Sequence, residues 1–226
     1  MAKTYSIAID GPAGAGKSTI ARRLAKELDY YYVDTGAIYR TVAYFLDLLA
    51  ISPKDVDGVN RYIDELTINI EYDEEGKQHM LMNGMDVTDD IRTQDISQKA
   101  SLVSAHKVVR DVLLDMQRQV AREHNVIMDG RDIGTVVLPN ADVKIFLSAS
   151  AEIRAKRRYD ELVAKGTKAD LNKIQEEIRQ RDHQDITRPI APLKQARDAI
   201  LVDTSNMTIN EVITTLQRII KEKIPV

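Results

Sequence analysis

The chain has 226 residues, of which 43% are hydrophobic and 30% charged, and it contains no cysteine. This composition is typical of a globular protein with a sizeable core, and it excludes disulfides and thiolate metal sites. The formal net charge of −3 argues against binding nucleic acid or a membrane through bulk charge, so a polyanion site needs local clustering of basic residues. With no membrane-span-length apolar run and no signal-peptide pattern, we expect a cytoplasmic protein.

The first predicted elements are a strand over 6–9, a glycine-rich turn and a helix over 18–28. The turn fits the phosphate-binding pattern G-x-x-x-x-G-K-[ST] in its usual setting between strand and helix. Its backbone N–H groups are expected to point at one anion, with the lysine adding charge and the serine hydroxyl placed to ligate Mg²⁺. The alternative is a turn that only caps the helix. The candidate residues are Gly11, Pro12, Ala13, Gly14, Ala15, Gly16, Lys17 and Ser18, with Thr19 directly behind them.

A second strand is predicted over 30–33, followed by helices over 37–50 and 54–65. The pattern then changes, because residues 67–72 and 78–82 alternate in hydrophobicity around a turn at 73–76. This indicates an antiparallel hairpin, with Val87 leading a third short strand. In a chain that otherwise alternates strands and helices, the hairpin is an insertion that we expect to be small and mobile.

Helical periodicity returns over 95–105 and 107–123, the latter with an apolar stripe of Val108, Val112, Met116 and Val120. Buried strands are predicted at 126–128, 143–147 and 200–202. Helices are predicted at 151–164, at 171–186 after a polar loop over 165–170, and from a Thr208–Glu211 capping box to about 221. Five strands separated by helices predict an α/β fold with a parallel sheet covered on both faces.

Four of these strands lead to positions suited to a site, namely the glycine turn at Gly11 and the carboxylates Asp34, Asp129 and Asp203. Since ligands bind at the carboxyl ends of parallel strands, we expect these positions to converge on one cleft. Asp129 ends an apolar strand, where proteins with this phosphate loop place the acid that holds Mg²⁺ directly or through water. Its alternative role is to start an Asp-Gly turn.

Arginines cluster on the two late helices. Arg154 and Arg158 lie four apart with Arg157 beside them, and Arg181, Asp185 and Arg188 share one face of the next helix if that helix extends to Arg188. Charged helix faces are often merely solvated. Two arginine-bearing helices hinged near Gly166 also describe a lid that closes over phosphates, and phosphoryl transfer needs mainly positioning and charge.

Five segments together resemble the bacterial cytidylate kinases, which are P-loop nucleoside monophosphate kinases. They are Gly11–Ser18, Asp34–Arg40, Ile91–Gln94, Asp129–Thr135 and Arg188–Leu193. The resemblance implies a three-layer P-loop fold with a five-stranded parallel sheet, a small antiparallel insert and a helical lid. It implies one kinase unit over 1–226, with a core over about 1–34, 95–150 and 195–226. The nucleoside-monophosphate region with the hairpin is expected over about 35–94 and the lid over about 154–186.

The resemblance implies transfer of the ATP γ-phosphate to CMP or dCMP by a monomer that uses Mg²⁺, held by Ser18 and Asp129. The implied catalytic residues are Lys17, Arg131, Asp132, Arg157 and Arg188. The acceptor phosphate would be held by Thr35, Arg40, Arg131 and Arg188. Ser101, Arg110 and Asp132 would face the base, and Arg181 and Asp185 the sugar.

One step has support from side-chain chemistry, since a carboxylate such as Asp132 accepts from the N4 amine of cytosine but repels O4 of uracil. Other nucleoside monophosphate kinases remain an alternative, although Asp129-Gly130-Arg131-Asp132 differs from the Asp-Gly-Phe-Pro-Arg pattern of adenylate kinases. A nucleotide-dependent switch lacks support because the chain has no Asn-Lys-x-Asp motif. A small-metabolite kinase of the shikimate or gluconate type fits the length and the insert less well.

Overall fold

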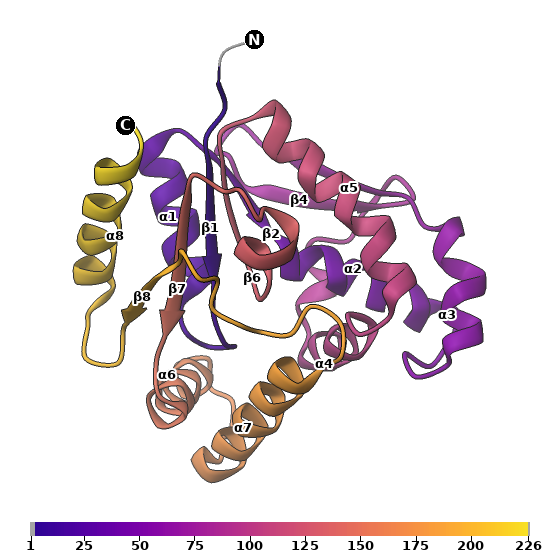
Figure 1. Cartoon of the computed structure of the whole chain (residues 1–226). Coiled ribbons are helices and arrows are strands. Elements are labelled where there is room, and N and C mark those ends of the chain that lie inside the picture. The colour runs from indigo at the N-terminus through magenta and orange to yellow at the C-terminus, as the bar shows by residue number, and fades with distance from the viewer. Residues whose placement is uncertain (1–2, 226) are drawn as a thin grey trace.

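The computed structural model describes residues 3–225, so residues 1–2 and 226 of the predicted unit lie outside it. Its centre is a parallel sheet of five strands in the order β2-β6-β1-β7-β8 (Figure 1). This confirms the predicted parallel sheet. The strands are β1 (Ser6–Asp10), β2 (Tyr31–Asp34), β6 (Val126–Gly130), β7 (Val143–Ser148) and β8 (Ile200–Asp203).

Successive side chains of a strand point to opposite faces, so the sheet carries two hydrophobic layers. In β1, Ala8 packs with α2, α4 and α5, whereas Ile7 and Ile9 pack with α1 and α8. Figure 1 shows α8 and α5 on opposite sides of the sheet. The three-layer α/β prediction is therefore confirmed. These helices are α1 (Lys17–Leu28), α2 (Thr35–Leu48), α4 (Gln94–Val103), α5 (Lys107–Glu123) and α8 (Ile209–Lys223).

Most predicted helix ends agree with the structure, and side-chain caps explain the shifts. The helix expected over 37–50 begins at Thr35, because the Asp34 carboxylate accepts the N–H of Ala37 and caps it. The predicted Thr208–Glu211 capping box is present. No helix within 3–225 is both long and apolar enough to cross a membrane. The remaining helical elements are α3 (Val56–Tyr62), η1 (Ile63–Glu65), η2 (Asp90–Arg92), η3 (Ile133–Val137), α6 (Ala151–Ala164) and α7 (Leu171–Thr187).

The predicted apolar stripe of α5 is confirmed at Val108, Met116 and Val120, which pack against the hydrophobic layer, and is wrong at Val112, which is 43% exposed. The most buried face of the helix is made by Val109, Arg110, Leu113 and Gln117. Two of these four side chains are polar, so hydrophobic periodicity underweights the face that the fold buries. This face turns Arg110 inward, which matters for the candidate site.

The insert is a separate antiparallel sheet in the order β3-β4-β5, formed by β3 (Ile68–Tyr72), β4 (Gln78–Met82) and β5 (Met85–Asp86). The hairpin prediction is confirmed, but the third strand precedes Val87 instead of starting there. The reason is a two-residue turn at Asn83-Gly84, whose φ angles of 49° and 81° suit a tight hairpin. Val87 still donates its N–H to the Met80 carbonyl.

Buried contacts join the insert to the core, which its alternating sequence pattern does not indicate. Met80 and Met82 are 1% and 5% exposed within the hydrophobic layer of α2. The Tyr72 hydroxyl donates to the Tyr32 carbonyl at 2.9 Å, and Gln78 Oε1 accepts the Asp34 N–H at 2.7 Å. The insert therefore touches β2 at the point where α2 begins.

Gly11 provides a stability prediction, because it connects β1 to the phosphate-binding turn with a φ of 149°. A Cβ atom there would lie 2.0 Å from the carbonyl oxygen of Leu147 in β7, a backbone atom that cannot move aside. We expect Gly11→Ala to lower the free energy of unfolding by about 3 kcal/mol or more, measured by urea denaturation. Gly76→Ala is the matched control, since φ is 75° but no heavy atom lies within 4 Å. It carries backbone strain alone, and an equal loss in both variants would contradict the steric explanation.

Candidate active site

A single large cavity of about 810 Å³ opens at the carboxyl ends of the parallel strands. Asp34 and Asp129 line it, as the sequence predicts, and Thr204 lines it in place of the neighbouring Asp203. Gly11 lies behind the lining, at the contact with β7 described above. Eight basic and five acidic side chains face this cavity, so a chain with a net charge of −3 carries a locally cationic cleft.

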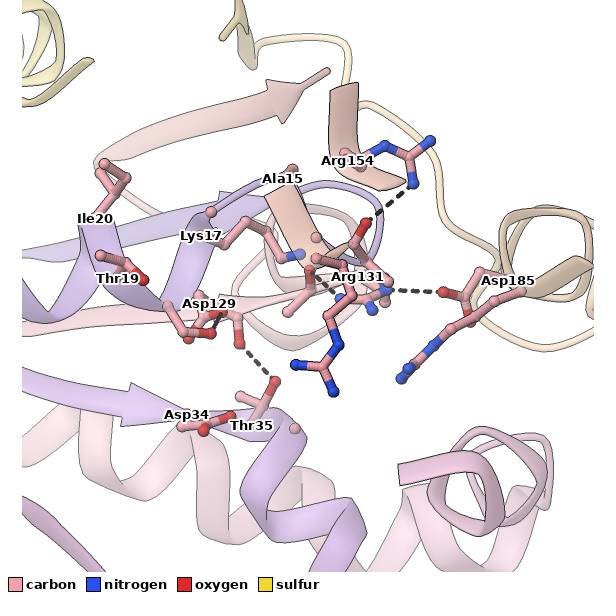
Figure 2. A pocket seen from close by; sticks show the side chains of 18 of the residues that line it. Ala15, Lys17, Thr19, Ile20, Asp34, Thr35, Asp129, Arg131, Arg154 and Asp185 are labelled. Atoms are coloured by element: carbon pink, nitrogen blue, oxygen red, sulfur yellow. Dashed lines mark hydrogen bonds and ion pairs between the residues drawn. The ribbon is translucent and has the colours of Figure 1, made fainter. Parts of the chain in front are cut away.

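The phosphate-binding turn forms one end of the cavity, where residues 13–19 line the wall. Lys17 is only 5% exposed, and its Nζ donates to the Pro12 carbonyl at 2.8 Å. Burial, followed by the nearby Arg131 charge, lowers the pKa of Lys17. Figure 2 shows this lysine pointing into the cavity toward the space below Ala15. An anionic ligand would restore the preference of Lys17 for its charged form.

Ser18 and Asp129 lie together beside the turn, with Ser18 Oγ donating to Asp129 Oδ2 at 2.9 Å. The Tyr32 hydroxyl donates to the other carboxylate oxygen at 2.8 Å. Burial and the Asp34 charge raise the pKa of Asp129. A hydroxyl and a carboxylate are the hard oxygen donors that Mg²⁺ prefers, and Mg²⁺ completes its shell with water and phosphate oxygens. The donor set therefore fits the ion.

The start of α2 forms a second wall. Thr35 Oγ1 donates to the Asp129 carbonyl at 2.7 Å, which joins this wall to β6 (Figure 2). Arg40 pairs with Asp34 at 2.9 Å through Nη2, while its buried Nε has no hydrogen-bond partner. A buried donor without an acceptor is costly, so Arg40 is suited to receive an anion from the cavity.

Asp132 sits between two arginines deeper in the cleft. It pairs with Arg110 Nη2 through Oδ2 and with Arg188 Nη2 at 3.1 Å through Oδ1. Side-chain exposures of 6–8% place all three out of bulk water. Arg110 lies just behind the residues that line the cavity, whereas Ser101, Asp132 and Arg188 line it.

Arg131, Arg181 and Asp185 form a third group, which reaches into the cavity from opposite sides. Arg131 Nε donates to Asp185 Oδ2 at 2.8 Å, and Figure 2 shows the two side chains facing each other. These charges hold the pKa of Asp185 below its usual value despite burial. Burial, followed by the Arg131 charge, lowers the pKa of Arg181 to about 10, and its buried Nε has no partner. This group therefore has unused donor capacity for a polar ligand.

The helices α6 and α7 pack against each other beside the phosphate-binding turn. Arg154 ties them to it, donating to the Ala13 carbonyl at 3.0 Å and pairing with Asp182 at 2.5 Å. Arg157 lies over the opposite edge of the cavity, where its guanidinium donates to the Thr204 carbonyl at 2.6 Å. Both arginines line the cavity. By contrast, Lys156 pairs with exposed Asp160 on a solvated helix face.

Comparison with known proteins identifies the family. The family model described as cytidylate kinase matches residues 7–222. The chain belongs to the cytidylate kinase family. A cytidylate kinase of Carboxydothermus hydrogenoformans is 50% identical over 217 residues, covering 96% of this chain and 97% of that protein. One of Shouchella clausii is 44% identical over 222 residues, covering 98% of each.

Among solved structures, an uncharacterized protein from Eubacterium ventriosum is similar with a TM-score of 0.52 and 14% sequence identity. The match covers 97% of this chain and 99% of that one. At this identity the likeness concerns the fold alone. The assignment to the cytidylate kinase family therefore rests on sequence over nearly the whole chain.

Three side chains of this cytidylate kinase family site have contacts that the sequence analysis does not predict. Asp34 caps α2 and pairs with Arg40. Tyr39 lines the cavity, and burial raises its pKa to about 12 while Arg110 stands 5.5 Å from its ring. Arg154 joins α6 to the phosphate-binding turn. Their positions within Asp34–Arg40 and beside Arg157 were visible, but their contacts depend on segments far away in the sequence.

Proposed function

We propose that this chain transfers the γ-phosphate of ATP to CMP and dCMP, giving CDP and dCDP. The observation that carries the proposal is the buried carboxylate of Asp132 between Arg110 and Arg188. Both arginines pair with this carboxylate, so its negative charge is balanced inside the buried site. A charged carboxylate beside guanidinium donors offers an acceptor next to donors, which is the complement of the cytosine edge.

The discrimination against uracil follows from the same group. Cytosine donates from N4 and accepts at N3 and O2, so Asp132 receives the amine and Arg110 serves the ring acceptors. Uracil presents an oxygen at position 4, which would face the carboxylate and leave it unpaired. A buried polar site left unpaired rejects the wrong ligand by up to ~10⁴-fold. Ser101, which lines the cavity nearby, is proposed to contact the base as well.

The acceptor phosphate is proposed to lie among Thr35, Arg40, Arg131 and Arg188, opposite the phosphate-binding turn that holds ATP. The partnerless Nε atom of Arg40 supports this arrangement. Arg181 and Asp185 are proposed to lie at the sugar, where the 2′ position must tolerate either hydrogen or hydroxyl. The γ-phosphate of ATP and the phosphate of CMP would then lie next to each other between Lys17 and Arg131.

Catalysis in this proposal is positioning plus charge. The positive charges of Lys17, Arg131 and Arg188 stabilise the negative charge of the phosphoryl group during its transfer. Arg157 adds a further positive charge from the lid. Ser18 and Asp129 would hold Mg²⁺, which neutralises charge on the ATP phosphates when bound. The active unit is proposed to be a monomer.

An assay of ATP consumption with CMP, dCMP, UMP, AMP and GMP as acceptors tests the proposal. We expect CMP and dCMP to have the highest kcat/KM, with UMP at least tenfold lower and the two purine nucleotides inactive. A preference for AMP or UMP would instead assign a different nucleoside monophosphate kinase. Turnover of ATP without any nucleotide acceptor would point to a switch or a metabolite kinase.

The lid proposal, with residues about 154–186 closing on the cleft, makes a prediction for the connection between α6 and α7. Lys165 and Lys168 lie there in an exposed segment between the two helices. We expect limited trypsin digestion to cut after these lysines, and a bisubstrate analogue joining ATP to CMP to slow the cut at least fivefold, because closure immobilises the segment. The fragments are identified by mass spectrometry.

Lys165→Gln with Lys168→Gln serves as the control, since it removes both cleavage sites and should leave the chain intact under the same digestion. Equal cleavage rates with and without the analogue would show that this segment does not respond to substrates. In that case, the assignment of 154–186 as a lid would be wrong. The regions proposed for the core and for nucleoside-monophosphate binding, about 35–94, would be unaffected.

A further inference from the structure

A second, smaller cavity of about 150 Å³ lies where the insert meets the core. Asp34 lines both cavities, so this one lies next to the candidate active site. Arg22, Lys77 and Arg92 border it. They come from α1, from the turn before β4 and from the end of η2, so only the tertiary structure brings them together.

These three cations are uncompensated within residues 3–225. None forms an ion pair with a carboxylate, and none donates a side-chain hydrogen bond among the described residues. By contrast, Lys107 and Arg218 each pair with an acidic residue of their own helix. Three like charges around one cavity repel one another unless an anion joins them.

The one acidic side chain in the wall is already engaged. Asp34 pairs with Arg40 and caps α2, so its charge is balanced from the active-site side. Gln78 accepts the Asp34 N–H, and Met80 and Ala37 supply apolar wall. Arg22 stands 5.5 Å from the Tyr32 ring, which holds its guanidinium over the cavity wall. The cavity is therefore bordered by three cations that are unpaired within the described residues, whereas the polar groups of Asp34 and Gln78 in its wall already have hydrogen-bond partners.

We propose that this cavity is an anion site for one phosphate group, held by Arg22, Lys77 and Arg92. Guanidinium forks match the oxygen geometry of phosphate, and the lysine adds a mobile charge. The volume corresponds to about five water molecules, which suits a tetrahedral oxyanion and excludes a whole nucleotide. The phosphate is either free inorganic phosphate or the phosphate of a small phosphate monoester.

A phosphate group in this cavity has a structural consequence. It links α1, the insert and η2 through Arg22, Lys77 and Arg92, which lie 55 and 15 residues apart in the sequence. The same wall contains Gln78 and the start of α2. A bound phosphate would therefore restrict the motion of the Asp34–Arg40 pair from the side away from the active-site cavity. Binding that joins separate elements stabilises the folded chain in proportion to ligand saturation.

Thermal unfolding with inorganic phosphate as the probe tests this proposal without reference to enzyme activity. At phosphate tenfold above its Kd, with ionic strength matched by chloride, we expect the Tm of the full chain to rise by about 3–5 °C. The phosphate-binding turn also takes phosphate, so the comparison between variants carries the result. Arg22→Gln and Arg92→Gln should each lose at least half of the phosphate-dependent rise.

Lys26→Gln is the matched control, because Lys26 is an exposed cation of α1 outside both cavities and should keep the full rise. Both arginines are exposed and form no ion pair among residues 3–225, so the variants are expected to fold. A full rise retained in Arg22→Gln and Arg92→Gln would overturn the proposal. Soaking crystals with tungstate should also give an anomalous peak among Arg22, Lys77 and Arg92, and a peak at the phosphate-binding turn alone would overturn it.

Repeating the series with glycerol 3-phosphate separates the two sources of the phosphate group. If only inorganic phosphate raises the Tm, the site binds the free ion. If glycerol 3-phosphate raises the Tm more, and the arginine variants reduce that rise, the site binds a phosphorylated metabolite. The outcome is independent of the acceptor assay described above. Failure of that assay would leave the anion site standing, and failure here would leave the proposed kinase activity standing.

Discussion

Lys17→Ala should reduce kcat/KM for phosphoryl transfer by ~10³-fold or more while the chain stays folded. The expected loss is this large because Lys17 is the charge that the phosphate-binding turn aims into the cavity, and charge placement supplies most of the rate in this chemistry. Its Nζ lies in a buried position 2.8 Å from the Pro12 carbonyl, where water cannot take over its role. Steady-state kinetics with saturating CMP measure the change.

The effect on stability should be small, about 1–2 kcal/mol at most. Removing Lys17 frees one carbonyl and takes away a charge whose own burial is unfavourable. Lys26→Ala, on an exposed position of the same helix, is the matched control and should keep full activity. Near-normal turnover in Lys17→Ala would show that the turn does not hold the transferred phosphate.

Asp132→Asn should reduce the preference for CMP over UMP by about 10²-fold, measured as the ratio of the two kcat/KM values. The amide keeps the size of the side chain but replaces one acceptor oxygen with a donor, so it no longer repels O4 of uracil. It also breaks the charge pairing with Arg110 and Arg188. We therefore expect kcat/KM for CMP to fall as well, whereas the KM for ATP changes less than threefold.

Asp198→Asn is the control for charge removal, since Asp198 pairs with Lys144 outside the large cavity and is 65% exposed. It should leave the CMP-to-UMP ratio unchanged. If Asp132→Asn lowers kcat/KM for CMP and for UMP equally, Asp132 does not contact the base. The same conclusion follows if the variant raises the KM for ATP as much as the KM for CMP. Asp132 would then belong to the ATP and Mg²⁺ side of the cleft.

Periodicity and turn chemistry predicted most of the fold. The apolar strands, the Gly11–Ser18 turn and the Thr208–Glu211 cap are local features, since each depends on neighbours within one helical turn or one strand. The third strand of the insert was misplaced because the Asn83-Gly84 turn was not recognised, although it is also a local signal. The predicted α5 stripe is wrong at Val112 for a different reason. Its buried face includes Arg110 and Gln117, which hydrophobicity assigns to solvent.

By itself, the sequence determined the kind of protein this is. A strand, a glycine-rich turn ending in Lys17-Ser18 and a following helix specify a phosphate site locally, because backbone N–H groups and one lysine suffice to build it. The segment Asp129–Thr135, together with Asp34–Arg40, then points to the cytidylate kinases, and identity over nearly the full chain shows that family.

Only the tertiary structure decided how charges are paired. Asp132 meets Arg110 and Arg188 from positions 22 and 56 residues away, and Arg131 meets Asp185 from 54 residues away. Arg22, Lys77 and Arg92 likewise share a cavity because the insert folds back against β2. Helix and strand periods report which face of an element is buried. Which charges then meet depends on the packing of elements distant in sequence, because ion pairs require contact within a few ångströms.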